Sequence, residues 1–158
     1  MIYELLKGGF TAIRGAYKGA EINTYQFRRF VERAGDSEDS VLRAARAASL
    51  TDSQSAALRS LLDLFMQAAE FMRQFGGKQY WKRMLSHSND KEAMREFNER
   101  LGQLLQLLHI DVAAQAAKWR REDADDRERD QVALQGKMDE VLASAATTAQ
   151  CTMTRPTY

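Results

Sequence analysis

Basic and aromatic side chains gather at two places in this sequence, in patterns that favour attraction to anionic lipid. In residues 2–19, a turn of about 100° per residue places three cations in one narrow helical stripe: Lys7, Arg14 and Lys18. A second group follows two glycines and contains Lys78, Trp81, Lys82 and Arg83, with Tyr80 among them. Each basic residue near an anionic membrane contributes about 1 kcal/mol, and Trp and Tyr favour the headgroup region. We predict that both groups bind lipid.

Both groups also have an ordinary structural explanation. Cations opposite an apolar face are what solvation of an amphipathic helix produces, and Glu4 beside the stripe weakens its charge. Tyr80 or Trp81 could close one end of a helical bundle while the neighbouring Lys and Arg side chains stay in water. The sequence leaves these alternatives open.

The opposite face of residues 2–19 is apolar, with Ile2, Leu6, Phe10 and Ile13 in line. Several glycines interrupt this segment, and each costs about 0.5–1 kcal/mol relative to alanine in a helix. Burial of the apolar face must therefore stabilise this helix, and we expect its intrinsic stability to be the lowest among the helices of the protein. This face is the one we expect to insert into a membrane.

No pattern in the chain indicates catalysis, and we predict neither enzymatic activity nor a cofactor. His87 and His109 lack carboxylate or cysteine partners at metal-ligand spacing. The single cysteine, Cys151, excludes an intramolecular disulfide and fits a reducing, cytoplasmic compartment. The net charge of +1, without a concentrated basic groove, argues against binding to nucleic acid.

Acidic residues gather after Trp119 at positions 123, 125, 126 and 130. Because Arg127 and Arg129 lie among them, the segment predicts a solvated, salt-bridged helix face rather than a metal site. An apolar stripe follows, and we predict that Trp119, Leu134 and Met138 anchor this last helix to the rest of the protein.

Helical periodicity predicts an all-α protein, an antiparallel four-helix bundle with a short connecting helix and a C-terminal brace helix. We expect the bundle over residues 1–118, the brace helix over 119–146 and a disordered tail over 147–158, with the connecting helix over 79–85. The second helix should be kinked or broken near Gly35, and a Thr51–Gln54 capping box should start the third. Arg28, Arg29 and Arg33 should point mainly away from the bundle. The expected core includes Leu61, Phe65, Leu101, Leu104 and Leu108.

Four short motifs, in order along the chain, carry a resemblance to one family of helical bundles. They are Gln26-Phe-Arg-Arg-Phe30, Phe75-Gly-Gly-Lys-Gln-Tyr-Trp-Lys-Arg-Met-Leu-Ser86, Phe97-Asn-Glu-Arg-Leu101, and Trp119-x-x-Glu122-Asp123 followed by Asp130. Their order and spacing resemble the N-terminal domain of the mixed lineage kinase domain-like family, within the wider group of HeLo and RPW8-type bundles. The glycine-rich first helix, the segment near Gly35 and the absence of a kinase-like, nucleotide-binding or prion-like domain depart from that pattern.

The resemblance implies an effector of regulated cell death, as in necroptosis, or of innate immunity. Such a protein would be cytoplasmic, move to membranes on activation, bind anionic phospholipids, self-associate and permeabilise the membrane. A kinase or nucleotide-binding signalling domain, in cis or in trans, would be its partner. The alternative is a protein-interaction or autoinhibitory module that never enters a membrane.

Overall fold

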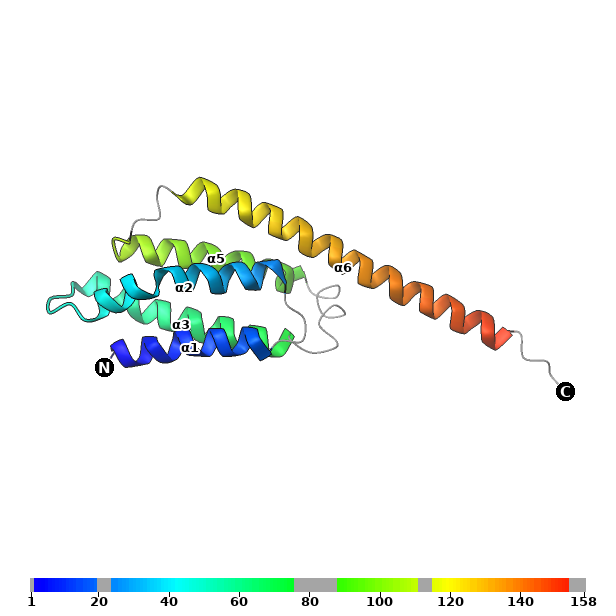
Figure 1. The fold of residues 1–158 in the computed structure, drawn as a ribbon, viewed down its shortest axis with the longest axis horizontal. Coiled ribbons are helices and arrows are strands. Elements are labelled where there is room, and N and C mark those ends of the chain that lie inside the picture. Colours follow the sequence, from blue (N-terminus) through cyan, green and yellow to red (C-terminus); the bar gives the residue numbers. More distant parts are fainter. Residues whose placement is uncertain (1, 20–23, 76–87, 111–114, 154–158) are drawn as a thin grey trace.

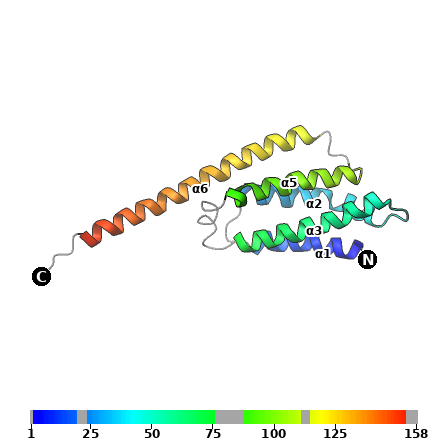
Figure 2. The same ribbon diagram turned by 180° about the vertical axis from the view of Figure 1, so that it is seen from behind.

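The computed structural model describes residues 2–19, 24–75, 88–110 and 115–153 (Figure 1). The elements in these ranges are the helices α1 (Ile2–Gly19), α2 (Tyr25–Ala45), α3 (Asp52–Phe75), α5 (Ser88–Leu107) and α6 (Ala116–Met153). The first four alternate in direction and lie side by side, which confirms the predicted all-α bundle. α6 packs across α2 and then runs on past the end of the bundle (Figures 1 and 2).

Local capping explains where two of these helices begin. The Thr24 hydroxyl accepts a hydrogen bond from the Phe27 N–H at 3.1 Å, at the start of α2. The Thr51 N–H donates to the Gln54 side chain, and the Gln54 N–H donates to the Thr51 hydroxyl, both at 3.1 Å. This reciprocal pair confirms the predicted capping box.

α2 runs through Gly35 without interruption, so the predicted break there is wrong. Ala34, Ser37 and Val41 are all buried on one side of the helix. Burial of this face on both sides of Gly35 offsets the intrinsic cost of one glycine, about 1 kcal/mol.

Aromatic rings join all four bundle helices at the centre, where the Phe30 ring of α2 lies 6.2 Å from the Phe97 ring of α5, centroid to centroid. The Phe65 ring of α3 lies 4.7 Å from the Phe10 ring of α1 and 6.3 Å from the Phe30 ring of α2, centroid to centroid. A Cβ added at Gly9 would lie 3.2 Å from Leu62 and 3.3 Å from Phe65, so α1 and α3 approach closely there. The predicted core residues are buried: Leu61, Phe65, Leu101, Leu104 and Leu108.

α6 is longer than the sequence predicted, because it begins at Ala116 and continues to Met153. The predicted end at residue 146 and the predicted disorder of residues 147–153 are therefore wrong. Alanine has the highest helix propensity, and the segment from Ala143 onward is rich in it. Thr147 and Thr148 add side-chain hydrogen bonds to the carbonyls of Ala143 and Ser144, each at 2.9 Å.

One further expectation concerns the neighbourhood of α5. The predicted connecting helix over residues 79–85 lies outside the described residues. α5 itself ends at Leu107, after which His109 adopts a φ of 57° and the Ile110 N–H bonds back to the Leu105 carbonyl. None of the described helices combines the length and the mean hydropathy that crossing a membrane requires.

Candidate functional site: the seam between α2 and α6

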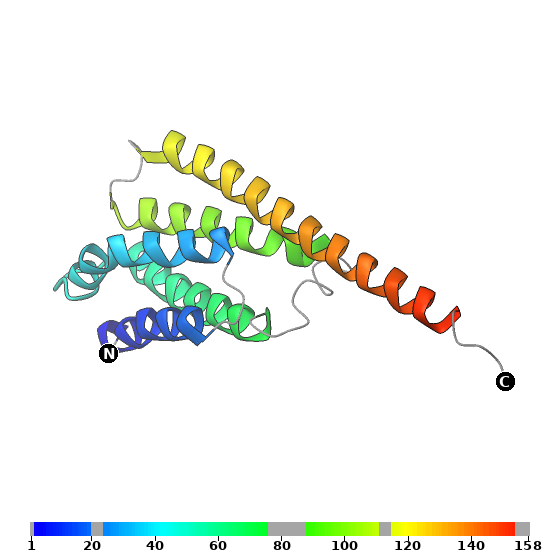
Figure 3. The same cartoon turned by 45° about the vertical axis from the view of Figure 1, so that its right-hand side comes forward.

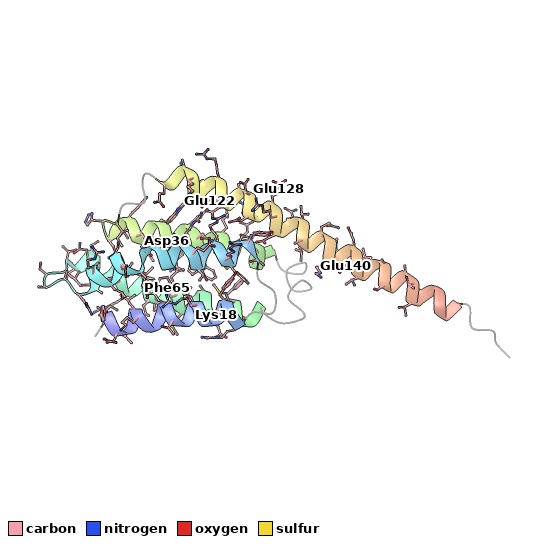
Figure 4. The ribbon with its side chains drawn as sticks, viewed as in Figure 1. Lys18, Asp36, Phe65, Glu122, Glu128 and Glu140 are labelled. Carbon is pink, nitrogen blue, oxygen red and sulfur yellow. The ribbon has the colours of Figure 1, made fainter. Side chains whose placement is uncertain are left out.

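Charged side chains of α2 and α6 meet where α6 packs across the bundle, and we call this cluster the α2–α6 seam. It consists of Arg29 and Arg33 from α2, and Glu122, Asp123, Asp126 and Asp130 from α6. Residues three or four apart share a face of a helix, so the two arginines and the four acids each form one row. Glu122 lies on the side of α6 that faces the bundle (Figure 4).

Arg33 is the more buried of the two seam arginines, with 3% of its side chain exposed. Its Nη1 donates to Asp123 at 2.7 Å and to Asn98 of α5 at 3.1 Å. Its Nη2 donates to Glu122 and to the Trp119 carbonyl, both at 3.1 Å, and its guanidinium carbon lies 4.5 Å from the Trp119 ring centroid. A buried charge is tolerated only when it is paired and hydrogen-bonded, and Arg33 meets this requirement by joining three helices.

Arg29 makes the second charged contact of the seam. Its Nε donates to Asp126 at 2.9 Å and its Nη2 donates to the other oxygen of that carboxylate at 3.4 Å. Glu122 lies 3.6 Å from Arg29, so this carboxylate faces both arginines. The Asp126 side chain is only 2% exposed, so the forked Arg29–Asp126 pair is largely screened from water.

Asp130 bonds to the backbone of α2 rather than to an arginine. One of its oxygens accepts from the Tyr25 N–H at 2.8 Å. The other accepts from the Gln26 N–H at 3.1 Å and from the Gln26 side-chain amide at 3.0 Å. Asp130 therefore satisfies donors at the N-terminus of α2, which have no partner within their own helix.

Burial and the closeness of the four seam carboxylates to one another affect their protonation. Burial raises the pKa of Asp123 and of Asp130, and the charge of Asp126 raises both further. Burial also acts to raise the pKa of Glu122, but the hydrogen bond from Arg33 and the charges of Arg29 and Arg33 outweigh it and lower that pKa. The hydrogen bond with Asp126 raises the pKa of Arg29.

The seam corrects two expectations from the sequence. Arg29 and Arg33 point toward α6 instead of away from the protein. Of the acidic residues, Asp126 is buried and Asp123 and Asp130 are half-buried, so this face is salt-bridged as predicted but is not fully solvated. The face of α2 that appears polar in a four-helix bundle is covered by a fifth helix. The sequence does show that Arg29 and Arg33 repeat at the same four-residue spacing as Glu122, Asp126 and Asp130, but it does not show that the two rows meet.

Two of the three residues predicted to anchor α6, Trp119 and Leu134, are half-buried and pack against the core. The third, Met138, is half-buried further along but is not among the described residues that pack against the core. A Cβ added at Gly102 of α5 would lie 3.6 Å from the Trp119 ring, so α5 has no side chain in the way of that ring. Beyond them, Val141 and Leu142 are exposed.

The predicted lipid-binding residues fall into three groups. Lys7 and Lys18 of α1 are exposed, whereas Arg14 pairs with Glu38 of α2 at 2.6 Å, which offsets its charge. The predicted basic turn, Lys78, Trp81, Lys82 and Arg83, lies outside the described residues. The predicted inserting face is turned into the bundle: Leu6, Phe10 and Ile13 are buried, and Ile2 is half-buried against the core.

An all-α bundle braced by an additional helix through charged contacts defines the class of this protein. The family model described as the mixed lineage kinase domain-like N-terminal domain matches residues 16–132, and the chain belongs to this family of non-catalytic helical domains. The matched region contains α2, α3, α5 and the whole seam. No curated protein and no solved structure shows significant similarity to the chain.

Among the described residues, no three His, Cys, Asp or Glu side chains are arranged to hold a metal ion. The seam acids are instead engaged by arginines and backbone N–H groups. What the arrangement can do is hold one helix against a bundle by charged contacts whose attraction is largely offset by the cost of desolvating the charges.

Proposed function

We propose that this domain is a membrane effector kept inactive while α6 is docked. Once α6 is released, the bundle would bind anionic phospholipid, self-associate and permeabilise the membrane, in regulated cell death or immunity. The protein would be cytoplasmic before activation. The single observation that supports this most is the seam, because α6 is held mainly by charged pairs, and the desolvation cost of such pairs offsets much of their attraction. Membership of the family supports the same proposal.

Contact with lipid would begin with the exposed cations. Lys7 and Lys18 are both on the outer side of α1, and no ion pair is shown for either among the described residues. At about 1 kcal/mol for each cation near an anionic surface, these two would recruit the protein reversibly. The basic turn, Lys78, Trp81, Lys82 and Arg83, is the second group proposed to bind lipid.

Permeabilisation would require a further step. The apolar face formed by Ile2, Leu6, Phe10 and Ile13 is packed in the core and must leave it to enter a membrane. Gly8, Gly15 and Gly19 lower the intrinsic stability of α1 without filling a close contact, since a Cβ at any of them would meet nothing within 4 Å.

Vesicle binding and leakage test the proposal. The full chain should bind vesicles of phosphatidylserine and phosphatidylcholine and spare vesicles of phosphatidylcholine alone. Arg33→Met, which weakens the docking of α6, should release the contents of the anionic vesicles faster than the unaltered chain does. Binding should weaken as salt rises, because the screening length shortens to about 8 Å at physiological ionic strength. The double variant Lys7→Glu/Lys18→Glu should bind at least about 30-fold more weakly, which corresponds to the loss of about 2 kcal/mol.

Arg59→Glu on α3 is the matched control, because Arg59 is an exposed cation on another helix. Charge reversal of Lys78, Lys82 and Arg83 tests the second group, and reversal at both groups should abolish binding. Unchanged binding by a folded protein reversed at both groups would contradict the proposal. That result would favour the alternative, a protein-interaction module, for which the exposed Val141 and Leu142 on the projecting part of α6 offer a surface.

A further inference from the structure

The N-terminal turn of α2 is completed by a residue of another helix. The first N–H groups of a helix have no acceptor in that helix and need a cap. Thr24 supplies a local cap for only one of them, the N–H of Phe27. The N–H groups of Tyr25 and Gln26 donate to the two oxygens of Asp130, at 2.8 and 3.1 Å, from more than a hundred residues further along the chain.

Other contacts fit Asp130 to this position. The side chain of Gln26, a residue that is 8% exposed, donates to the same carboxylate at 3.0 Å. Arg129, the preceding residue, places its guanidinium carbon 5.3 Å from the Tyr25 ring centroid. The first turn of α2 contains no acidic residue of its own, so Asp130 also supplies the negative charge that favours a helix N-terminus.

Docking of α6 is what keeps Asp130 in place. Asp126, one turn earlier on α6, is paired with Arg29, which lies one turn after Tyr25 on α2. The cap and the ion pair therefore sit side by side on the same two helices. When α6 leaves, both are lost together, and the Tyr25 and Gln26 N–H groups keep no protein acceptor at these positions.

We propose that docked α6 acts as the N-terminal cap of α2, so that release of α6 opens the first turn of α2. In the chain, only residues 20–24 separate this turn from α1, the helix whose apolar face is proposed to enter the membrane. The inference deepens the proposed function and rests on it for its biological meaning: α6 restrains the corner that leads into α1 as well as covering α2. By linkage, opening of that turn also weakens the docking of α6 to the same extent.

Amide hydrogen exchange on the full chain tests the cap without any membrane. In Asp130→Ala, exchange of the Tyr25 and Gln26 amides should accelerate about five- to thirtyfold, the usual effect of losing a cap. The amides around Leu61 and Leu101 in the core should keep their protection. Asp125→Ala is the matched control, because Asp125 is an exposed acid on α6 outside the seam, and its loss should leave exchange in α2 unchanged.

Two further variants separate the cap from general damage. Asp130→Asn keeps the shape and one acceptor oxygen, so it should fold and show an intermediate acceleration even if Asp130→Ala does not fold. Arg33→Met weakens docking about two turns away from the cap, and it should accelerate the same two amides because α6 is released more often. Equal exchange at Tyr25 and Gln26 in Asp130→Asn and Asp125→Ala would overturn the inference. The inference would also be overturned if Arg33→Met released α6 while the Tyr25 and Gln26 amides stayed protected from exchange.

The vesicle assays fail or succeed independently of this experiment. If exchange behaves as expected but no vesicle leaks, the cap exists and the proposed membrane function is wrong. If vesicles leak but the two amides are unaffected, the membrane function stands and the cap is not the link between α6 and α1.

Discussion

α1 and α6 both lie on the outside of the same bundle, but different forces hold them. α1 buries Leu6, Phe10 and Ile13 completely or nearly so against α3 and α2. α6 makes its contact through arginines and carboxylates, and much of its length projects beyond the bundle (Figure 3). Burial of apolar area stabilises a helix directly, whereas a buried ion pair must first offset the desolvation of both charges and contributes less. We therefore expect α6 to be released from the bundle first. α1 would leave the core only in a later step.

The largest expected loss of stability comes from the buried apolar face of α1. Phe10→Ala removes a fully buried ring that lies 4.7 Å from the Phe65 ring, and it should lower the free energy of unfolding by about 3–5 kcal/mol. Urea denaturation measures this loss, which should be the same at low and high salt. The exposed Leu5 is the control, because Leu5→Ala should change stability by less than about 0.5 kcal/mol. A loss below about 1 kcal/mol in Phe10→Ala would mean that α1 is not held by its apolar face.

A smaller effect is expected in the seam. Arg33→Met should weaken the docking of α6 by about 2–3 kcal/mol, because Asp123 and Glu122 lose their partner while still partly desolvated. Limited proteolysis of α6 measures docking, and cleavage should rise while the bundle stays intact. Arg28→Met is the control, since Arg28 is exposed and its ion pair with Glu32 stays within α2. If both variants are cleaved at the same rate, charged contacts do not hold α6.

A still smaller effect is expected from pH. The pKa values of Asp123 and Asp130 are raised in the docked state, so docked α6 binds protons more tightly than released α6. Docking should therefore strengthen as pH falls from 7, with no further gain from these two groups below their ordinary value of 3.8. Glu122, whose pKa is lowered, acts oppositely, and its contribution is lost only as pH falls below 4.5 through its docked pKa.

Hydrogen exchange of the seam amides, corrected for the intrinsic pH dependence of exchange, checks this direction between pH 7 and pH 5. In the double variant Asp123→Asn/Asp130→Asn, the exchange of the seam amides should depend less on pH. Docking that weakens steadily over the same range in the unaltered protein would show that the ion pairs outweigh the desolvation of these acids.

The smallest effect separates two glycines of α1. Gly15→Ala should stabilise the protein by about 0.5–1 kcal/mol, because a Cβ there meets nothing within 4 Å. Gly9→Ala should gain less or lose stability, since its Cβ would lie 3.2 Å from Leu62 and 3.3 Å from Phe65. Thermal unfolding of the two variants compares them directly. Equal gains would show that α1 and α3 are not closely packed at Gly9.

Periodicity in the sequence was enough to predict the bundle, because each of its helices buries one apolar face. Leu61, Phe65 and Leu101 follow from that rule alone. The seam could not be read in the same way. The pattern of α2 alone predicts a solvent-exposed Arg33. The local sequence does not determine which face of α2 is covered by α6. The end of α6 was missed for another reason, because an alanine-rich segment without an apolar face gives no periodic signal although its propensity favours a helix.

The length of α6 has a mechanical consequence. Its 38 residues make a rod of about 57 Å at 1.5 Å per residue, and the seam lies in the half nearer to Ala116. Glu140 marks the free half, which lies beyond the bundle (Figure 4). A partner that pulled on this end would apply force first to the α6–bundle contacts nearest the free half of the helix and then to those further away. The contact of Leu134 with the core would break first, the hydrogen bonds of Asp130 second, and the ion pairs of Arg33 last. α6 would therefore separate from the bundle progressively from its C-terminal end, instead of in one step.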